Sequence, residues 1–283
     1  KFNTLLMGMV AAERVFKVID TKSSIIDEGK ISVKTFKGDV CFHNVNFSYV
    51  PNTQVLNEIS FNIKKGSKVA IVGSTGAGKT SVINLLNRFY DIDSGEISID
   101  GINIMDYKLS SLRKNIGIVL QDVFLFSDTI FNNITLKDEN ISINEVKLAA
   151  KQIGVHDFIM SLPNNYYYNV KERGIMLSSG QRQLIAFLRV YVSDPQILIL
   201  DEATSSIDSA SEILIQNATE KLTKNRTSLI IAHRLATVKK ADNIIVMDSG
   251  NIIEQGSHRE LINHMNGYYK KLYDVQFQVK NVS

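Results

Sequence analysis

The sequence predicts an α/β protein built around a mostly parallel sheet, with an antiparallel β sub-domain before it and a helical sub-domain inserted into it. Five short apolar runs support the parallel sheet, because strands covered by helices on both faces are apolar along their whole length. Two other runs alternate apolar and polar residues, as half-exposed antiparallel strands do. The apolar runs are residues 68–72, 116–120, 197–200, 229–232 and 244–247, and the alternating runs are residues 40–47 and 59–63.

The composition is that of an ordinary folded protein. Hydrophobic residues make up 44% of the 283 residues and charged residues 22%, which excludes a disordered or collagen-like chain. The formal net charge is only +3 and no long basic run is present, so we expect no nucleic-acid partner. Cys41 is the single cysteine, which excludes an intrachain disulfide and a cysteine-based zinc site.

The N-terminal part differs from the rest of the sequence. Residues 5–12 are apolar and lead into Glu13 and Arg14, and residues 21–38 are polar and rich in lysine, as linkers are. No stretch approaches the roughly 18–20 apolar residues that cross a bilayer, so we expect the chain as given to be soluble. It begins at Lys1 rather than Met, which indicates an end cut from a longer protein.

The elements after the linker follow in a regular order. Residues 40–47 predict a strand with one bulge, and residues 59–63 predict its antiparallel neighbour. The apolar run 68–72 ends in glycines and leads into a helical pattern. Helical periodicity then dominates the stretch of about 122–192, which we expect to be the inserted sub-domain. Its clearest helices are residues 144–153 and 178–192.

A glycine-rich loop connects the first apolar strand to the first helix, with the spacing of a complete phosphate-binding loop, G-x-x-x-x-G-K-[ST]. The glycines let backbone N–H groups turn towards phosphate oxygens, and the helix adds its positive N-terminal end. Lys79 is expected to reach the β and γ phosphates, and the Thr80 hydroxyl to ligate Mg²⁺. The sequence thus predicts a P-loop NTPase (RecA-like) core. The predicted nucleotide contacts are Gly73, Ser74, Thr75, Gly76, Ala77, Gly78, Lys79, Thr80 and Ser81.

The apolar run 197–200 ends in two carboxylates, Asp201 and Glu202, which is the form of a Walker B segment. Successive residues of a strand face opposite ways, so Asp201 can hold Mg²⁺ while Glu202 points at the γ-phosphate and the attacking water. Two acidic residues at a strand end could instead form an exposed turn. The phosphate-binding loop upstream favours the nucleotide site.

The segment just before Walker B identifies a family. Residues 177–181 are L-S-S-G-Q, and with them the chain resembles the ATP-binding cassette (ABC) family, whose signature is L-S-G-G-Q. The resemblance spans roughly residues 38–276 and implies an ATPase. Other motifs of that family fall in order: Tyr49 before the loop, Gln121 after a strand, Ser205-Ser206-Ile207-Asp208 after Walker B, and His233 within I-A-H-R-L.

Three segments resemble exporter-type cassettes in particular. They are residues 121–127, Glu172-Arg173-Gly174 and residues 11–16, the last of which follows the final transmembrane helix in that subfamily. The resemblance implies that residues 1–37 are the end of a removed transmembrane domain with its linker, and that residues 38–283 are the cassette. An N-terminal helix of a naturally separate subunit is the alternative.

The resemblance also implies a role for each motif residue. Tyr49 would stack on adenine with Val55 nearby, and Gln121 would reach Mg²⁺ and the attacking water. Glu202 would act as the general base for that water, and His233 would contact the γ-phosphate. The implied cofactors are ATP and Mg²⁺, and the implied magnesium ligands are Thr80, Gln121 and Asp201.

The signature is expected to act on the nucleotide of a facing cassette. In the family's geometry the helix that begins at Ser178 points at the γ-phosphate held by the partner, so that two cassettes sandwich two ATP molecules head to tail. Closure by ATP and loosening by hydrolysis would drive export through the transmembrane domain of the same transporter. The implied contacts with the partner's ATP are Ser178, Ser179, Gly180, Gln181 and Asp208.

Ser179 departs from the family pattern, which has glycine at that place. An added side chain at a helix start that approaches phosphate costs space, although serine is a favourable residue there. A homodimer is favoured because the other motifs are intact. The alternative is one half of a heterodimeric exporter that lends its partner a weaker signature.

Other function classes fit less well. A DNA-maintenance ATPase of the SMC type would need a coiled coil between Lys79 and Asp201, where no heptad run is present. Glu202 and His233 argue against a non-catalytic cassette, and the exporter-like segments argue against an importer. We expect a full-length integral membrane protein that holds this chain at its cytoplasmic face, and the transported substrate stays open.

Overall fold

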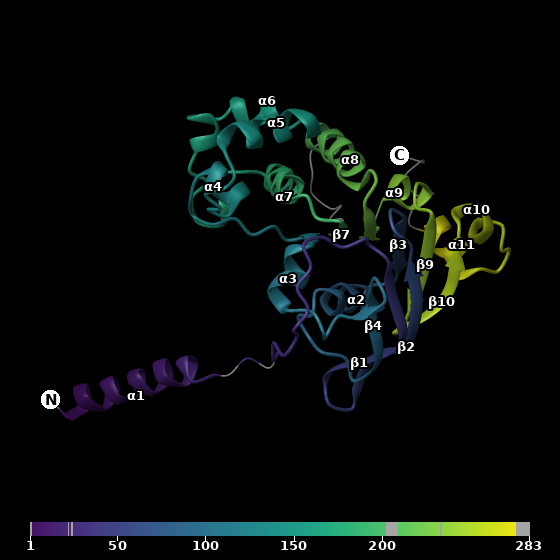
Figure 1. Ribbon diagram of the computed structural model, residues 1–283, viewed down its shortest axis with the longest axis horizontal. Coiled ribbons are helices and arrows are strands. Elements are labelled where there is room, and N and C mark those ends of the chain that lie inside the picture. Colours follow the sequence, from purple (N-terminus) through teal and green to yellow (C-terminus); the bar gives the residue numbers. More distant parts are fainter. Residues whose placement is uncertain (1, 22, 24, 202–208, 233, 276–283) are drawn as a thin grey trace.

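The computed structural model describes residues 2–21, 23, 25–201, 209–232 and 234–275. Its centre is a six-stranded sheet in the order β10-β9-β3-β8-β7-β6, and a four-stranded sheet lies beside it (Figure 1). In the large sheet all neighbours are parallel except β10 and β9. This confirms the predicted α/β class. The strands are β3 (Lys68–Gly73), β6 (Ile116–Val119), β7 (Ile197–Asp201), β8 (Thr227–Ile231), β9 (Asn243–Asp248) and β10 (Asn251–Gly256).

The apolar runs of the large sheet are explained by two hydrophobic cores, one on each face. Alternate residues of a strand point to opposite faces, so Ile71 lies in one core while its neighbours Ala70 and Val72 lie in the other. In β7, Leu198 and Ile199 are divided in the same way, and every residue of that strand is buried. A polar residue in the middle of these strands would therefore enter a core.

The four-stranded sheet has the order β2-β1-β4-β5 and is antiparallel, as predicted for its first two strands. Phe42 of β1 pairs with Phe61 of β2, and their stacked rings have centroids 4.5 Å apart. The register shifts between Phe42 and Val45, where the sequence predicted a bulge. Helix α2 (Lys79–Leu86) fills the core between the two sheets. The strands are β1 (Val40–Val50), β2 (Thr53–Ile63), β4 (Ser94–Ile99) and β5 (Ile102–Asn103).

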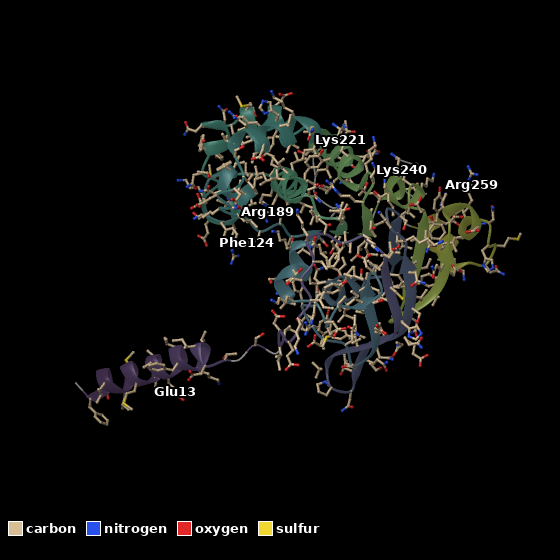
Figure 2. The ribbon with its side chains drawn as sticks, viewed as in Figure 1. Glu13, Phe124, Arg189, Lys221, Lys240 and Arg259 are labelled. Atoms are coloured by element: carbon tan, nitrogen blue, oxygen red, sulfur yellow. The ribbon has the colours of Figure 1, made fainter. Side chains whose placement is uncertain are left out.

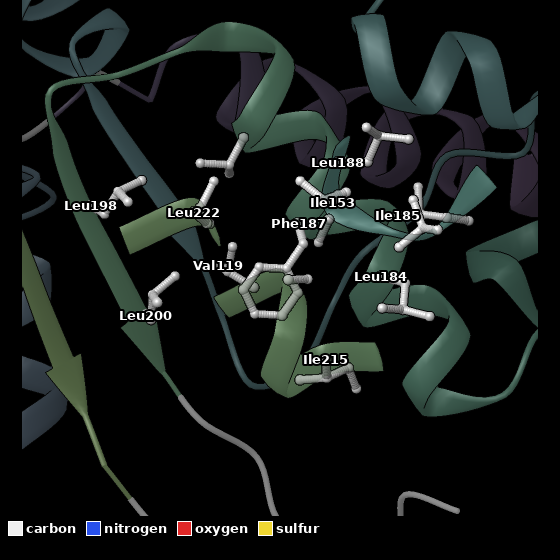
Figure 3. Packing of buried hydrophobic residues seen from close by; sticks show 14 of the residues in the cluster. Val119, Ile153, Leu184, Ile185, Phe187, Leu188, Leu198, Leu200, Ile215 and Leu222 are labelled. Atoms are coloured by element: carbon white, nitrogen blue, oxygen red, sulfur yellow. The ribbon is translucent and has the colours of Figure 1, made fainter. Parts of the chain in front are cut away.

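Residues 122–192 are mostly helical and extend from the edge of the large sheet beside β6 and β7 (Figure 1), and α7 joins the core on the other face of that sheet. Figure 3 shows how they join it: Phe187 of α7 lies between Leu200 of β7 and Ile215 of α8. Arg189 of α7 donates from Nε to the Asn133 carbonyl at 2.8 Å, and Figure 2 places its side chain near Phe124. The helices are α4 (Ile130–Thr135), α5 (Ile143–Ile153), α6 (His156–Met160), the 3₁₀ turns η1 (Asn165–Tyr167) and η2 (Glu172–Gly174), α7 (Ser179–Ser193) and, beyond this stretch, α8 (Ser209–Thr223).

Helix α1 (Phe2–Ile19) extends away from the body, and every described side chain on it is exposed (Figure 1). Of the helices in the described residues, none has the length and apolar character that a bilayer crossing requires. The linker after α1 is fixed at its end, since the Asp100 carboxylate accepts from the backbone N–H groups of Lys37 and Gly38 at 2.7 and 2.9 Å. The remaining helices are α3 (Leu109–Lys114), α9 (Leu235–Lys239), α10 (His258–Ile262) and α11 (Tyr268–Tyr273).

Candidate functional site

The glycine-rich loop lies between the end of β3 and the start of α2, as the sequence predicted. A Cβ on Gly73 would lie 2.1 Å from the Met247 carbonyl oxygen, so the adjacent strand β9 leaves room only for glycine. Gly78 caps α2 in the left-handed region at φ +96°. Gly76 has φ +84°, and a Cβ there would meet no heavy atom within 4 Å. The loop thus leaves open space beside Gly76, as a phosphate cradle requires.

Lys79 folds back over the loop. Its Nζ donates to the carbonyl oxygens of Gly73 at 2.9 Å and Ser74 at 2.7 Å, and the residue is only 8% exposed. Burial lowers the pKa of Lys79, and the nearby Asp201 carboxylate opposes this shift. The ammonium group is therefore held inside the cradle, where a phosphate group would neutralise its charge.

A cleft of about 570 Å³ opens at this loop. It is within the size range of small-molecule sites, roughly 300–1,000 Å³. Residues from six separate segments meet there, and the sequence analysis had singled out ten of the eleven. The lining residues are Tyr49, Val55, Thr75, Gly76, Gly78, Lys79, Thr80, Ser81, Gln121, Asp201 and Ile231.

Tyr49 lies near the end of β1, at the rim of this cleft. Its hydroxyl lies 3.1 Å from Ser81 Oγ and accepts from Asn84 Nδ2 at 3.0 Å. The rings of Phe47 and Tyr90 contact the Tyr49 ring edge-on, with centroids 4.7 and 4.9 Å away. These contacts fix the ring while leaving the residue 43% exposed. A fixed, partly exposed aromatic ring can stack on a nucleobase.

Three oxygen donors line the same cleft: the Thr80 hydroxyl, the Gln121 amide and the Asp201 carboxylate. Asp201 ends β7 and is 9% exposed, while Thr80 and Gln121 are exposed. Such oxygen ligands suit Mg²⁺, whose sites usually supply one or two carboxylates and leave much of the shell to phosphates and water. Within the described residues no cluster of three or more His, Cys, Asp and Glu side chains could hold another kind of metal.

The L-S-S-G-Q segment forms the start of α7. Ser178 is the N-cap, and its side chain accepts from the Gln181 N–H at 3.2 Å while the Gln181 side chain accepts from the Ser178 N–H at 3.0 Å. This reciprocal capping box fixes the first turn. Ser179 is the first helical residue and is exposed, whereas Gly180 is buried. The side chain at position 179 therefore fits without displacing any part of the fold.

Three predicted site residues, Glu202, Asp208 and His233, lie outside the described residues. Two residues at the site had not been singled out. Ile231 ends β8 and lines the cleft, and Asp248 ends β9 and accepts from the Ser74 hydroxyl. Both stand at the carboxyl ends of parallel strands, where α/β sheets place ligand sites. That rule, applied to residues 229–232 and 244–247, would have found them.

Comparison with known proteins gives a consistent result. A family model described as ABC transporter matches residues 56–205. The chain is 47% identical over 272 residues to an ATP-dependent lipid A-core flippase of Blochmanniella floridana, covering 95% of this chain and 46% of that protein. It is 44% identical over 275 residues to the putative multidrug export ATP-binding/permease protein YgaD of Bacillus subtilis (strain 168), covering 96% of this chain and 47% of that protein.

A solved structure shows the same likeness in three dimensions. It is that of a bacterial Atm1-family ABC exporter with ATP bound, which superposes with a TM-score of 0.86 at 39% sequence identity. The match covers 98% of this chain and 48% of the other. The chain thus spans about half the length of the relatives it matches.

Proposed function

The chain belongs to the ABC transporter family, and we propose that it is the cassette whose ATP hydrolysis powers export through a transmembrane domain encoded with it. One observation gives this proposal its main support. The phosphate-binding loop, Tyr49, Gln121 and Asp201 all line a single cleft. The relative YgaD is described as an ATP-binding/permease protein, and this chain spans about half of its length. The family's ABC domain binds ATP.

ATP would lie across the cleft with its adenine on Tyr49 and its phosphates in the loop. The backbone N–H groups of residues 75–80 and the start of α2 would surround the phosphates, and Lys79 would turn from the carbonyls of Gly73 and Ser74 to the β and γ oxygens. Val55 and Ser81 also line the cleft. Stacking is tolerant of the base, so Tyr49 supplies affinity rather than base selectivity.

Hydrolysis would use the other groups of the site. Mg²⁺, held by Thr80, Gln121 and Asp201, would neutralise charge on the β and γ phosphates. A water oxygen would attack the γ-phosphorus in line as the bond to the β–γ bridging oxygen breaks, while Glu202 takes the water's proton. His233 would contact the γ-phosphate. The roles of Glu202 and His233 rest on the family resemblance alone.

The start of α7 would serve a second cassette. The capping box leaves the helix N-terminus exposed at Ser178 and Ser179, and the positive end of a helix of fifteen residues attracts an anion. The start of α7 would face the γ-phosphate bound by a partner cassette, and Asp208 would contact the partner's ATP across the interface. Two cassettes would thus close on two ATP molecules. The transmembrane domain would hold this chain at the cytoplasmic face of a membrane, and residues 38–283 would form the cassette.

Ser179 supports a second candidate within the same family. A heterodimeric exporter could place this chain's serine-containing signature at a weaker site while the chain keeps its own Walker B carboxylates. If so, Ser179→Gly should raise the ATPase rate or the affinity between cassettes. An unchanged rate and affinity would leave the homodimer as the proposal.

The test of the proposed function separates binding from turnover. We expect the chain to bind ATP and release phosphate, Lys79→Ala to lose tight binding, and Glu202→Gln to keep binding but lose turnover. Lys65→Ala is the matched control, because this lysine is exposed on the turn after β2. Retained tight binding by Lys79→Ala, or normal turnover by Glu202→Gln, would contradict the assigned roles.

A further inference from the structure

The Asp248 carboxylate joins the phosphate-binding loop to the C-terminal helix α11. The Ser74 hydroxyl donates to Asp248 Oδ1 at 3.1 Å, and the Tyr268 hydroxyl donates to the same oxygen at 2.9 Å. Asp248 ends β9, the strand that packs beside β3 at the base of the loop. A single oxygen atom thus connects residue 74 to residue 268.

Tyr268 is itself held firmly. Glu254 of β10 caps the start of α11, with its Oε1 accepting from the Tyr268 N–H and its Oε2 from the Tyr269 N–H, both at 2.8 Å. The first residue of the helix is therefore fixed on the edge strand of the large sheet. The Tyr268 hydroxyl reaches Asp248 from that fixed position. The contact therefore depends on the packing of α11 against β10.

The end of β9 and the turn after it each form a hydrogen bond with the loop. Besides the bond from Ser74, the Gly250 N–H donates to the Ala77 carbonyl at 3.2 Å. The Ser74 carbonyl in turn accepts from Lys79 Nζ. When Lys79 turns to phosphate, the Ser74 carbonyl loses the hydrogen bond from Lys79. The hydrogen bond from the Ser74 hydroxyl to Asp248 remains and still holds residue 74 in place.

We propose that Tyr268 is a positioning residue for ATP binding, which acts through Asp248 to hold Ser74 and the phosphate-binding loop in their binding geometry. The inference rests on the proposed nucleotide site. Bonds to an ionised carboxylate are the stronger kind, and Tyr268 fixes the position of the oxygen atom to which Ser74 donates. A loop held in place before the ligand arrives loses less conformational freedom on binding. The bond to Asp248 raises the pKa of Tyr268, as expected for a hydroxyl that donates to a carboxylate.

Tyr268→Phe tests the proposal against Tyr269→Phe. Each change removes one hydroxyl from α11, but the Tyr269 hydroxyl lies 2.7 Å from His258 Nδ1 and its ring is 1% exposed. We expect Tyr268→Phe to weaken binding of a fluorescent ATP analogue to the chain by about three- to tenfold, the value of one hydrogen bond. Tyr269→Phe should lower the melting temperature and leave the affinity within about twofold, a purely structural effect.

A double-mutant cycle then asks whether Tyr268 acts through Ser74. We expect Ser74→Ala to weaken binding, and the pair Ser74→Ala with Tyr268→Phe to bind no more than about twofold more weakly than Ser74→Ala alone. Unchanged affinity in Tyr268→Phe, or losses that multiply in the pair, would overturn the inference. Lys79→Ala is the reference variant. Tight ATP binding by Lys79→Ala would contradict the proposed nucleotide site itself, whereas the Tyr268 variants test only the positioning role of Tyr268.

Discussion

Asn133 holds the loop that follows the predicted Gln121 segment. Its side chain is fully buried, with Oδ1 accepting from the Phe126 N–H at 2.8 Å and Nδ2 donating to the carbonyls of Phe126 and Thr129, both at 3.0 Å. The same residue's carbonyl accepts from Arg189 of α7. Asn133→Ala would release this loop while leaving the backbone bond to Arg189 in place.

The cost of Asn133→Ala can be worked out from these bonds. Both carbonyls keep a donor, because Phe126 O also accepts from Asp128 N and Thr129 O from Asn133 N. The Phe126 N–H loses its acceptor, which costs about 1–3 kcal/mol. The cavity left by the amide adds about 1 kcal/mol. We therefore expect a loss of about 2–4 kcal/mol, or roughly 5–15 °C in melting temperature for a chain of this size.

The assay is urea unfolding of the parent chain and Asn133→Ala, with Asn132→Ala as the matched control. Asn132 belongs to the same helix but is only half-buried, and its Nδ2 donates to Asp128 at 2.8 Å. Its removal should cost less than about 1 kcal/mol. Equal losses in the two variants, or a loss below about 1 kcal/mol in Asn133→Ala, would refute the reasoning.

Three further outcomes are expected. The ion pair and hydrogen bond to Lys137, with bonds from Thr129 and Asn132, lower the pKa of Asp128 from 3.8 to about 2, so its stabilisation is present above about pH 4 and lost as the pH falls towards 2. Urea unfolding from pH 5 to 2 should therefore show a smaller decline in Asp128→Asn than in the parent, and equal declines would contradict this assignment. Tyr49→Ala should weaken ATP and GTP about equally, by roughly tenfold or more, and an unchanged titration would place the stacking residue elsewhere. Ser178→Ala should cost about 1 kcal/mol in thermal unfolding through loss of the cap, and no change would show that the capping box adds nothing.

Much of the fold could be predicted because local patterns decide it. The runs at 68–72 and 197–200 are apolar throughout since each strand is buried on both faces, and β7 confirms this residue by residue. Strands β4 and β10 were not predicted. In β4 only Ile97 and Ile99 are buried, and in β10 Ile252 is half-buried and Ile253 exposed, so neither sequence contains a continuous apolar run. Strand β4 pairs with β1 much earlier in the chain, whereas β10 pairs with β9 directly before it.

The candidate site, too, could be predicted only in part. The phosphate-binding loop could be predicted from the spacing of its glycines and Lys79. The spacing is strict because only glycine fits at position 73, next to the Met247 carbonyl. The connection from Ser74 through Asp248 to Tyr268 spans more than half of the sequence and depends on the packing of α11 on β10. No periodicity in the sequence encodes a contact of that kind. The buried bonds of Asn133 are hidden for the same reason, because an asparagine in a helix gives no sign of what its amide meets.

We propose that ATP joins two copies of this cassette, and the most direct test is the molecular mass in solution of Glu202→Gln with and without Mg-ATP. Blocking hydrolysis should trap the closed sandwich, so we expect a shift from monomer to dimer when Mg-ATP is added. Adding Lys79→Ala to the same chain should abolish the shift. A variant that binds ATP in a separate titration and yet stays monomeric would contradict the claim.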